Sequence, residues 1–336
     1  MREERVGEQV SLLYVPVPAE RVEARPEEDW DYATADTKTH THGFHPYPAM
    51  MIPQVARRLI RMYGRTGYTL LDPFCGSGTS LVEARLSGIN AYGIDLNPLA
   101  VLLARVKSTP LPDALAIFLA KAEANIAGMA QFVSEVKGEH WVQVMQGDMR
   151  VRQPIPSETI DLVVTSPPYG DSHTTVAYGQ FSRLSLQWLG LPDEEAKSVD
   201  SRALGGKQVD IETLPYPSQT LEATYEQIAQ SERRRARQVR AFYDDFALCL
   251  AEITRVCRKG AIACFVVGNR TVRGVKIPTD TILVEMAEGF GWRFVEAFER
   301  RIPNKRMPLR NSPSNVPGEQ GETMLGETIV VLEATC

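Results

Sequence analysis

Residues 159–169 read TIDLVVTSPPY, an apolar run that ends in two prolines and a tyrosine. The run is short and β-branched, which is typical of a buried parallel strand. Because proline lacks an N–H and fixes φ, Pro167 and Pro168 predict a stiff turn whose carbonyls need other partners. Open α/β sheets bind ligands at the carboxyl ends of their strands. This turn, with the Ser166 hydroxyl before it and the Tyr169 ring behind it, can hold a flat group that carries an NH₂. A simple strand terminator fits the tetrapeptide equally well.

The segments on either side alternate between strand and helix patterns. We expect strands at 68–72, 91–95, 141–145, 159–166, 261–267, 292–298 and 327–332, with helices at about 79–86, 98–106, 112–137 and 239–257. This alternation predicts an α/β fold with a doubly wound, mostly parallel sheet of seven strands. The last two strands are close in sequence, so we expect them to form an antiparallel pair at one edge.

Two segments break the alternation. Residues 1–40 are polar and acidic with scattered prolines, which indicates an irregular N-terminal arm. Residues 191–238 contain polar stretches, glycines, prolines and an arginine cluster, which indicate an inserted, partly irregular lobe. The remaining residues, 41–190 and 239–336, are expected to form the main domain.

Composition narrows the class of protein. Hydrophobic content of 43% and charged content of 24% are ordinary for a globular protein. No apolar stretch approaches the roughly 20 residues that span a bilayer, and the charged N-terminus lacks a signal-peptide core. The five cysteines and five histidines show no metal-ligand spacing and no disulfide framework. We therefore expect a cytoplasmic protein with reduced thiols, no metal and no membrane partner.

The net charge of −5 argues against general polyanion binding, but a nucleic-acid footprint is a local patch. Two basic patches occur, within 233–240 and within 300–310. Each fits a solvated face as well as a binding surface.

Residues 72–79 read DPFCGSGT and lie between the first strand and its helix. Gly76 and Gly78 allow positive φ and leave room for a ligand on the backbone. The helix that begins at Thr79 offers free N–H groups to a carboxylate or another anion. A dinucleotide fingerprint would need glycine in place of Leu81, and a P-loop would need a lysine that this stretch lacks. In isolation the two glycines also fit a tight structural turn.

The next two strand ends carry carboxylates. Asp95 lies 23 positions after Asp72, where an acidic residue can accept hydrogen bonds from both hydroxyls of a ribose. Asp148 and the apolar Met149 follow the third strand and suit the amino group and flat face of an adenine. Three successive strand ends thus predict a loop, a ribose acceptor and an adenine acceptor.

Residues 72–79, together with TSPPY at 165–169, resemble the S-adenosylmethionine-dependent amino-methyltransferases of DNA, particularly those acting on N4 of cytosine. HPYP at 45–48 is similar to the segment that this family places ahead of its cofactor loop to close over the methionine end. The resemblance covers roughly 40–190 and 239–334. It implies a Rossmann-like class I methyltransferase fold, in which 41–190 and 239–336 are the catalytic domain and 191–238 is a target-recognition lobe.

The resemblance also implies a cofactor site. Gly76 and Gly78 would pass under the methionine moiety, Asp95 would hold the ribose, and Asp148 would take the adenine amino group. The full set of implied cofactor residues is His45, Pro46, Tyr47, Asp72, Pro73, Phe74, Gly76, Gly78, Thr79, Asp95, Leu96, Asp148 and Met149.

The implied catalytic residues are Ser166, Pro167, Pro168 and Tyr169. Ser166 and the Pro167 carbonyl would bind the target NH₂, and Tyr169 would stack on the base. Serine at the first position is more typical of cytosine enzymes, whereas adenine enzymes more often carry aspartate. The resemblance thus implies site-specific methyl transfer to the exocyclic N4 amine of a flipped-out cytosine in double-stranded DNA.

We further expect a prokaryotic, cytoplasmic monomer or homodimer from a restriction-modification system, with a cognate restriction endonuclease acting on the same site. Lys305, Arg306 and Arg310 are expected to contact DNA, because they crowd a proline-bounded loop between the last two strands. Three alternatives stay open: an N6-adenine DNA methyltransferase, an RNA amino-methyltransferase, and a catalytically silent nucleic-acid-binding protein.

Overall fold

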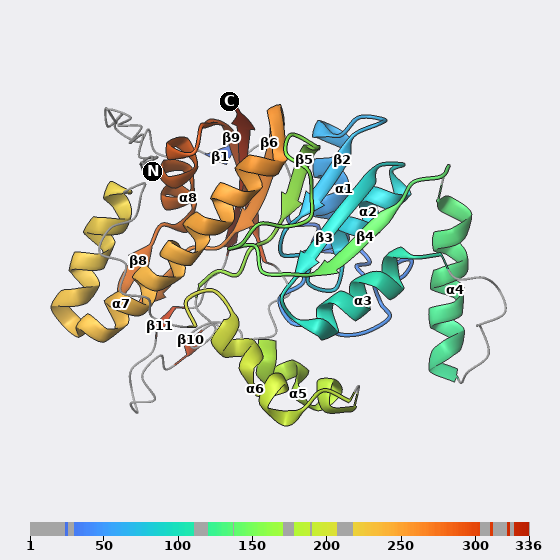
Figure 1. Cartoon of the computed structure of the whole chain (residues 1–336), viewed down its shortest axis with the longest axis horizontal. Helices are drawn as coiled ribbons and strands as arrows, with labels where there is room; N and C mark the ends of the chain where they lie inside the picture. Colours follow the sequence, from blue (N-terminus) through green and yellow to red (C-terminus); the bar gives the residue numbers. More distant parts are fainter. Residues whose placement is uncertain are drawn as a thin grey trace, which may run out of the picture.

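The structure is a computed structural model that describes residues 24–25, 30–110, 120–136, 138–170, 178–188, 190–206, 218–302, 310–311, 321–322 and 326–335. An eight-stranded sheet runs through the middle of this described part (Figure 1). Its order is β1-β9-β12-β6-β5-β2-β3-β4. The strands are β1 (Ala24–Arg25), β2 (Thr69–Asp72), β3 (Asn90–Asp95), β4 (Val142–Gln146), β5 (Ile160–Thr165), β6 (Cys257–Val267), β9 (Trp292–Arg301) and β12 (Gly326–Ala334).

The sheet is mostly parallel, as expected. Among its described strands only β12 runs antiparallel to its neighbours, β6 and β9. The seven expected strands are all present, and the expected antiparallel pair is β9 with β12. This pair is not the outermost, however, because the two-residue β1 pairs in parallel with β9. The N-terminal segment therefore adds an eighth strand that the sequence pattern did not predict.

Helices cover both faces of the sheet. Alternate residues of each strand point to opposite faces, and apolar residues on each face pack against helices. Leu71 and Val163 face α7 and α8 on one side. Leu70 and Val164 face α1, α2 and α3 on the other. The helices are α1 (Pro53–Tyr63), α2 (Thr79–Leu86), α3 (Pro98–Ser108), α4 (Ala120–Glu135), α5 (Tyr178–Trp188), α6 (Asp193–Arg202), α7 (Gln219–Val256) and α8 (Thr279–Gly289). The doubly wound α/β arrangement is confirmed.

Helix α7 is the longest described element, with 38 residues. Its helical backbone is interrupted at Glu232, where φ is −152° and ψ is 99°. The expected boundary of the inserted lobe, at 238/239, falls inside the second half of this helix. The described part of 191–238 is largely helical, since it contains α6 and the first part of α7.

Two short two-stranded sheets complete the described elements. One pairs β7 (Arg270–Val272) with β8 (Val275–Ile277), and the other pairs β10 (Arg310–Asn311) with β11 (Gly321–Glu322). None of the described helices is both long and apolar enough to cross a membrane.

The end of the expected N-terminal arm belongs to the core. Trp30 is fully buried, with its ring 4.9 Å from that of Phe298 and the Arg58 guanidinium 4.0 Å from its centroid. Its carbonyl accepts a 3.0 Å hydrogen bond from Arg300 Nε on β9. Residue 30 and its neighbours therefore anchor the chain to the same edge of the sheet as β1.

Candidate active site

A pocket of about 990 Å³, measured with its open mouth, lies at the carboxyl ends of β2 to β5. It collects most of the residues that the sequence predicted for the cofactor and the catalytic turn. Twelve of them line it: Tyr47, Asp72, Pro73, Phe74, Gly76, Thr79, Asp95, Leu96, Asp148, Met149, Ser166 and Pro168. The other five predicted residues in this part of the chain do not line it: His45, Pro46, Gly78, Pro167 and Tyr169.

Asp72, the last residue of β2, holds the base of the cofactor loop. Its carboxylate accepts hydrogen bonds from Thr165 Oγ1 (2.7 Å), Phe74 N (3.2 Å) and the Ser80 hydroxyl. These bonds join β2 to β5 and α2. Burial raises the pKa of Asp72 to about 6 despite these hydrogen bonds. The buried carboxylate therefore fixes where the loop begins and ends.

The two glycines of the loop have different surroundings. Gly76 has a φ of +48° and lines the pocket beneath the Tyr47 ring, and its N–H donates to Asp95 Oδ2 (2.8 Å). Gly78 has a φ of +88° and precedes α2, and a Cβ there would lie 2.8 Å from Ala104 Cα on α3. Gly76 therefore borders the ligand space, whereas Gly78 is needed for the turn and for close packing against α3.

Asp95 ends β3 at the side of the pocket. Its two oxygens accept hydrogen bonds from the backbone N–H groups of Gly76 and Asn97, both at 2.8 Å. Burial raises the pKa of Asp95 to about 6, and the charge of Asp72 adds to the shift. The carboxylate is thus held in a fixed orientation by the loop that it borders.

Asp148 follows β4 and is tied to an arginine that the sequence did not single out. Arg150 donates from Nε to Asp148 Oδ1 (2.9 Å) and from Nη2 to Asp148 Oδ2 (2.7 Å), and it also pairs with Asp245 (2.8 Å). Burial alone would raise the pKa of Asp148, but the Arg150 hydrogen bonds outweigh it and lower the pKa. Asp148 therefore stays ionised next to the buried Met149.

Of the expected closing segment, Tyr47 and Pro48 line the pocket, together with the three residues that follow. Tyr47 OH accepts a 3.1 Å hydrogen bond from Asn97 Nδ2, and its ring stacks on that of Tyr178 at 6.1 Å. Asn97 is also the N-cap of α3, where its Oδ1 accepts from Leu99 N. One side chain thus joins the closing segment to the helix at the pocket wall.

The proline turn follows β5, and its polar groups face β6 and β12. Tyr169 OH donates to Glu327 Oε1 (2.8 Å) and lies 3.2 Å from Ser166 Oγ. The Ser166 hydroxyl also reaches the Val266 carbonyl at 3.2 Å. Glu327 in turn pairs with Arg300. Burial and the neighbouring Glu327 raise the pKa of Tyr169, so the phenol keeps its proton.

The structure describes none of the three side chains that were predicted to contact DNA, so none of them can be placed at this site. Lys305 and Arg306 lie outside the described residues. Arg310 is described only as backbone, in β10.

The pocket also contains residues that the sequence did not reveal. Val199 and Arg202 come from α6, Ala203 and Leu204 follow that helix, and Cys249 comes from α7. Arg202 Nε is buried without a hydrogen-bond partner among the described residues. No local pattern marks these positions. The Asn-Pro pair that begins α3 was a recognisable capping signal and could have identified Asn97.

Comparisons with known proteins find similarity to methyltransferases. A family model described as "RMKL-like, methyltransferase domain" matches residues 44–189. The type II methyltransferase M.MvaI of Kocuria varians is 31% identical over an alignment of 421 positions, gaps included, which covers 90% of this chain and 93% of that protein. The type II methyltransferase M.MjaII of Methanocaldococcus jannaschii is 40% identical over 84 residues, 24% of this chain and 16% of that protein.

A tRNA (guanine(10)-N2)-dimethyltransferase of Methanothermobacter thermautotrophicus is 30% identical over 130 residues, 38% of this chain and 30% of that protein. The match to M.MvaI, in contrast, extends over nearly the whole of both proteins. This chain therefore belongs to the DNA methyltransferase family that includes M.MvaI, with the class I methyltransferase fold and S-adenosylmethionine as its cofactor.

Proposed function

We propose that this protein is a site-specific DNA methyltransferase that methylates the exocyclic N4 amine of a flipped-out cytosine. The observation that carries the proposal is that Ser166 and Pro168 line the same pocket as Gly76 and Asp95. An amine bound at the turn would therefore be next to the cofactor.

The pocket residues suit S-adenosylmethionine. Asp95 offers a fixed carboxylate for the ribose, Gly76 leaves backbone open beneath the methionine end, and Phe74 and Met149 offer apolar walls for the adenine. The unpaired Arg202 Nε is a hydrogen-bond donor that a ligand could engage. Bound there, the cofactor would supply an electrophilic methyl group on its sulfonium.

The hydrogen bonds at the turn indicate how Ser166 would act. Tyr169 has one hydroxyl proton, which it gives to Glu327, so it can only accept from Ser166. The Ser166 proton is shared between Tyr169 and the Val266 carbonyl. A lone pair of Ser166 Oγ is then left to accept an N–H from the target amine.

A nucleobase amine is a poor nucleophile because its lone pair is delocalised into the ring. Hydrogen bonds from its N–H groups to Ser166 Oγ and to the Pro167 carbonyl would draw the nitrogen toward tetrahedral geometry and aim the lone pair at the methyl group. Alignment of two bound reactants contributes up to about 7–11 kcal/mol in ideal intramolecular models. Attack of the nitrogen on the methyl carbon would break the bond from that carbon to the sulfonium sulfur and leave a neutral thioether, and the methylated nitrogen would then lose one proton to water. No covalent intermediate on the protein is required.

Several finer features belong to the same proposal. The serine of the turn favours cytosine over adenine as the base. The names of M.MvaI and M.MjaII support a modification enzyme of a restriction-modification system, with a cognate endonuclease as partner. Residues 191–238 are proposed as the target-recognition lobe, and the prokaryotic cytoplasm as the location.

The second candidate is an RNA amino-methyltransferase. It is favoured by the match to the tRNA dimethyltransferase, although that match covers 38% of this chain, against 90% for M.MvaI.

Labelled S-adenosylmethionine separates these candidates. Purified protein is incubated with the labelled cofactor and either plasmid DNA or bulk tRNA, and the product is digested to nucleosides and identified by mass spectrometry. We expect N4-methylcytosine in the DNA and no label in the tRNA. N6-methyladenine would overturn the choice of base, and label confined to tRNA would overturn the choice of substrate.

A further inference from the structure

Three exposed arginines, Arg233, Arg234 and Arg237, lie just after the kink of α7. We call them the arginine elbow. Their neighbours on the helix are engaged: Arg235 bonds Gln238, and Arg240 pairs with Glu222 and Asp244. No hydrogen bond or ion pair joins the three elbow arginines to another described residue.

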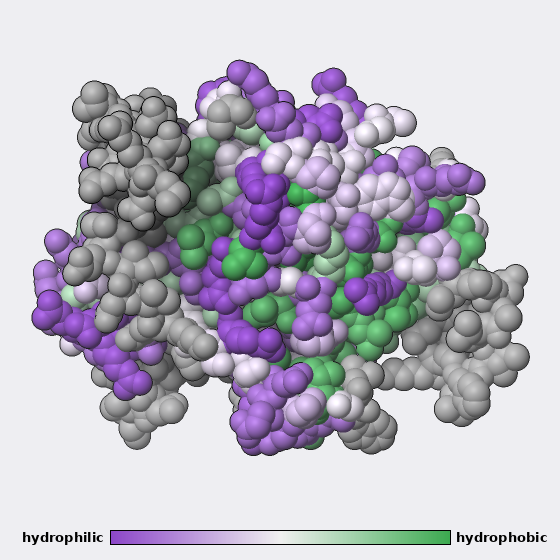
Figure 2. Space-filling view, viewed as in Figure 1, coloured by the Kyte–Doolittle hydropathy of each residue, from purple (hydrophilic) through white to green (hydrophobic). Residues whose placement is uncertain are grey.

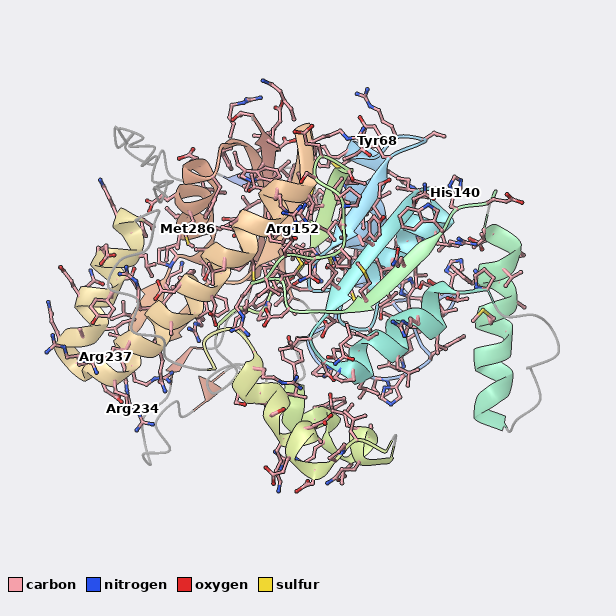
Figure 3. The ribbon with its side chains drawn as sticks, in the orientation of Figure 1. Tyr68, His140, Arg152, Arg234, Arg237 and Met286 are labelled. Carbon is pink, nitrogen blue, oxygen red and sulfur yellow. The ribbon has the colours of Figure 1, made fainter. Side chains whose placement is uncertain are left out.

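The elbow side chains point into solvent. In Figure 3, Arg234 and Arg237 project outward from α7 at the lower left of the molecule. Figure 2 shows strongly hydrophilic residues at the same place. The protein as a whole carries a net charge of −5, and these three cations, which no described residue pairs, form a local positive group that contrasts with it.

The course of α7 brings the elbow to the side of the sheet where the parallel strands end and the proline turn lies. The helix ends at Val256 and leads directly into β6, at the edge where the parallel strands begin. From Arg237 to Val256 an α-helix rises about 30 Å. A strand of six residues, such as β5, spans only about 20 Å. The elbow therefore reaches the edge where the strands end, which is also the edge that carries Ser166.

The β7–β8 hairpin links the elbow to the proline turn. Arg270 begins β7, and its Cζ lies 2.2 Å from where a Cβ on Gly170 would be, so its guanidinium covers the residue after Tyr169. At the tip of the hairpin, Arg273 pairs with Glu232 at the kink of α7. Three extended residues span about 10 Å. The hairpin therefore connects the proline turn to the kink of α7, where the elbow begins.

We propose that the arginine elbow binds the phosphate backbone of duplex DNA beside the flipped nucleotide. Arginine is suited to phosphate because its donors form a rigid fork. One strand of B-DNA presents a phosphate about every 3.4 Å along its axis, so three arginines within two helical turns can engage two or three neighbouring phosphates. Phosphate contacts position the duplex and carry no sequence information. This inference rests on the proposed function and adds the surface that holds the substrate.

The test replaces all three elbow residues in the full chain, Arg233→Gln, Arg234→Gln and Arg237→Gln. The control is Arg61→Gln, Arg65→Gln and Lys259→Gln, which removes the same charge from three other exposed positions at the opposite edge of the sheet. Binding of a fluorescent duplex is measured over a range of KCl concentrations. Each lost phosphate contact reduces the slope of log K against log [salt] by about 0.9.

We expect the salt slope of the elbow variant to fall by the equivalent of about two to three phosphate contacts. Its affinity at low salt should fall at least tenfold, whatever the DNA sequence. The control variant should keep the wild-type slope, and both should bind S-adenosylmethionine normally. A wild-type slope for the elbow variant would overturn the inference. So would loss of tRNA binding with duplex binding intact.

The same variants separate this inference from the proposed function. If the wild-type protein methylates DNA but the elbow variant binds DNA normally, only the inference fails. If the elbow variant loses duplex binding while the wild-type protein methylates no DNA, only the proposed function fails. The elbow variant should keep its kcat at saturating DNA and show a raised KM, since the elbow lies outside the pocket.

Discussion

The Asp95 carboxylate is held by two backbone N–H groups, yet burial raises its pKa to about 6. Only the ionised form can accept hydrogen bonds from both hydroxyls of a ribose. We therefore predict that S-adenosylmethionine affinity is full well above pH 6 and falls about tenfold as the pH drops to about 5. Isothermal titration calorimetry across this range measures the effect.

Two variants of the pocket carboxylates check the assignment to Asp95. Asp95→Asn should weaken binding by about 1.5–3 kcal/mol at neutral pH and flatten the pH dependence. Asp148→Asn is the control, because the pKa of Asp148 is lowered and this group does not titrate in the same window. An unchanged pH dependence in Asp95→Asn would contradict the prediction.

The raised pKa of Asp95 also has a consequence for stability. A carboxyl that titrates near 6 when folded and near its model value of 3.8 when unfolded binds protons preferentially in the native state between those values. Its contribution to the free energy of unfolding is therefore greatest below about pH 4 and declines as the pH rises through about 6. Asp72 contributes with the same sign, because burial raises its pKa similarly.

Tyr169 combines a ring with a hydroxyl that is bound to Glu327 and adjacent to Ser166. We predict that Tyr169→Ala abolishes methyl transfer, because it removes the stacking surface for the base. Tyr169→Phe keeps that surface, so it should retain measurable transfer and lose about 1 kcal/mol of stability with the hydrogen bonds. Single-turnover rates and denaturant unfolding test the pair, with cofactor affinity as the control. Equal rates for the two variants would show that the ring does not contribute.

Among single elements, the loop before α2 shows most clearly why glycine is required. Gly78 has a φ of +88° and lies against the backbone of α3, while Gly67 has a similar φ of +87° with nothing within 4 Å of a Cβ. Gly67→Ala should therefore cost about 1–2 kcal/mol, which is the backbone strain alone. Gly78→Ala should cost about 1–3 kcal/mol more, because α3 must also move.

Urea unfolding of the two glycine variants measures the difference. If both variants lose the same stability, the contact between Gly78 and α3 is not needed for packing. Cofactor affinity in Gly78→Ala should also fall, since displacement of α2 would move Thr79 at the pocket wall.

Strands and helices could be predicted from the sequence where the apolar residues repeat with a clear period. The pocket could be predicted where residues at the ends of strands form it. The run at 159–165 became β5, and the strand ends at Asp72, Asp95 and Asp148 meet in one pocket. The lobe was harder to predict. The first part of α7 lies in a stretch of mixed polar residues, and its helix is held by distant contacts such as Ser218 and Thr220 with Glu285. No local pattern records such contacts.

At the scale of the whole molecule, the N-terminal segment depends most clearly on contacts with residues that are distant in sequence. Trp30 is fully buried against β9, although composition alone indicated an irregular arm. We predict that Trp30→Ala lowers the free energy of unfolding by about 3–5 kcal/mol. Trp141→Ala is the control, because Trp141 is 40% exposed and should cost much less. Equal losses in chemical denaturation would contradict the assignment of Trp30 to the core.

The network at the turn could not be predicted for a similar reason. Tyr169 and Glu327 are 158 positions apart, and Arg300 and the Trp30 carbonyl are 270 apart. Such partners are brought together only by the order of strands in the sheet. The sequence therefore singled out residues 166–169 but not the groups that orient Tyr169.

That order of strands has a consequence for synthesis on the ribosome. Glu327 belongs to β12, the last strand of the sheet to be translated, and β12 is inserted between β6 and β9. A nascent chain that has emerged only as far as the end of α7 already contains all the residues that line the pocket, but Tyr169 still lacks its carboxylate partner. The pocket can thus be assembled before the orientation of Tyr169 is fixed, which happens only when the final strand is inserted.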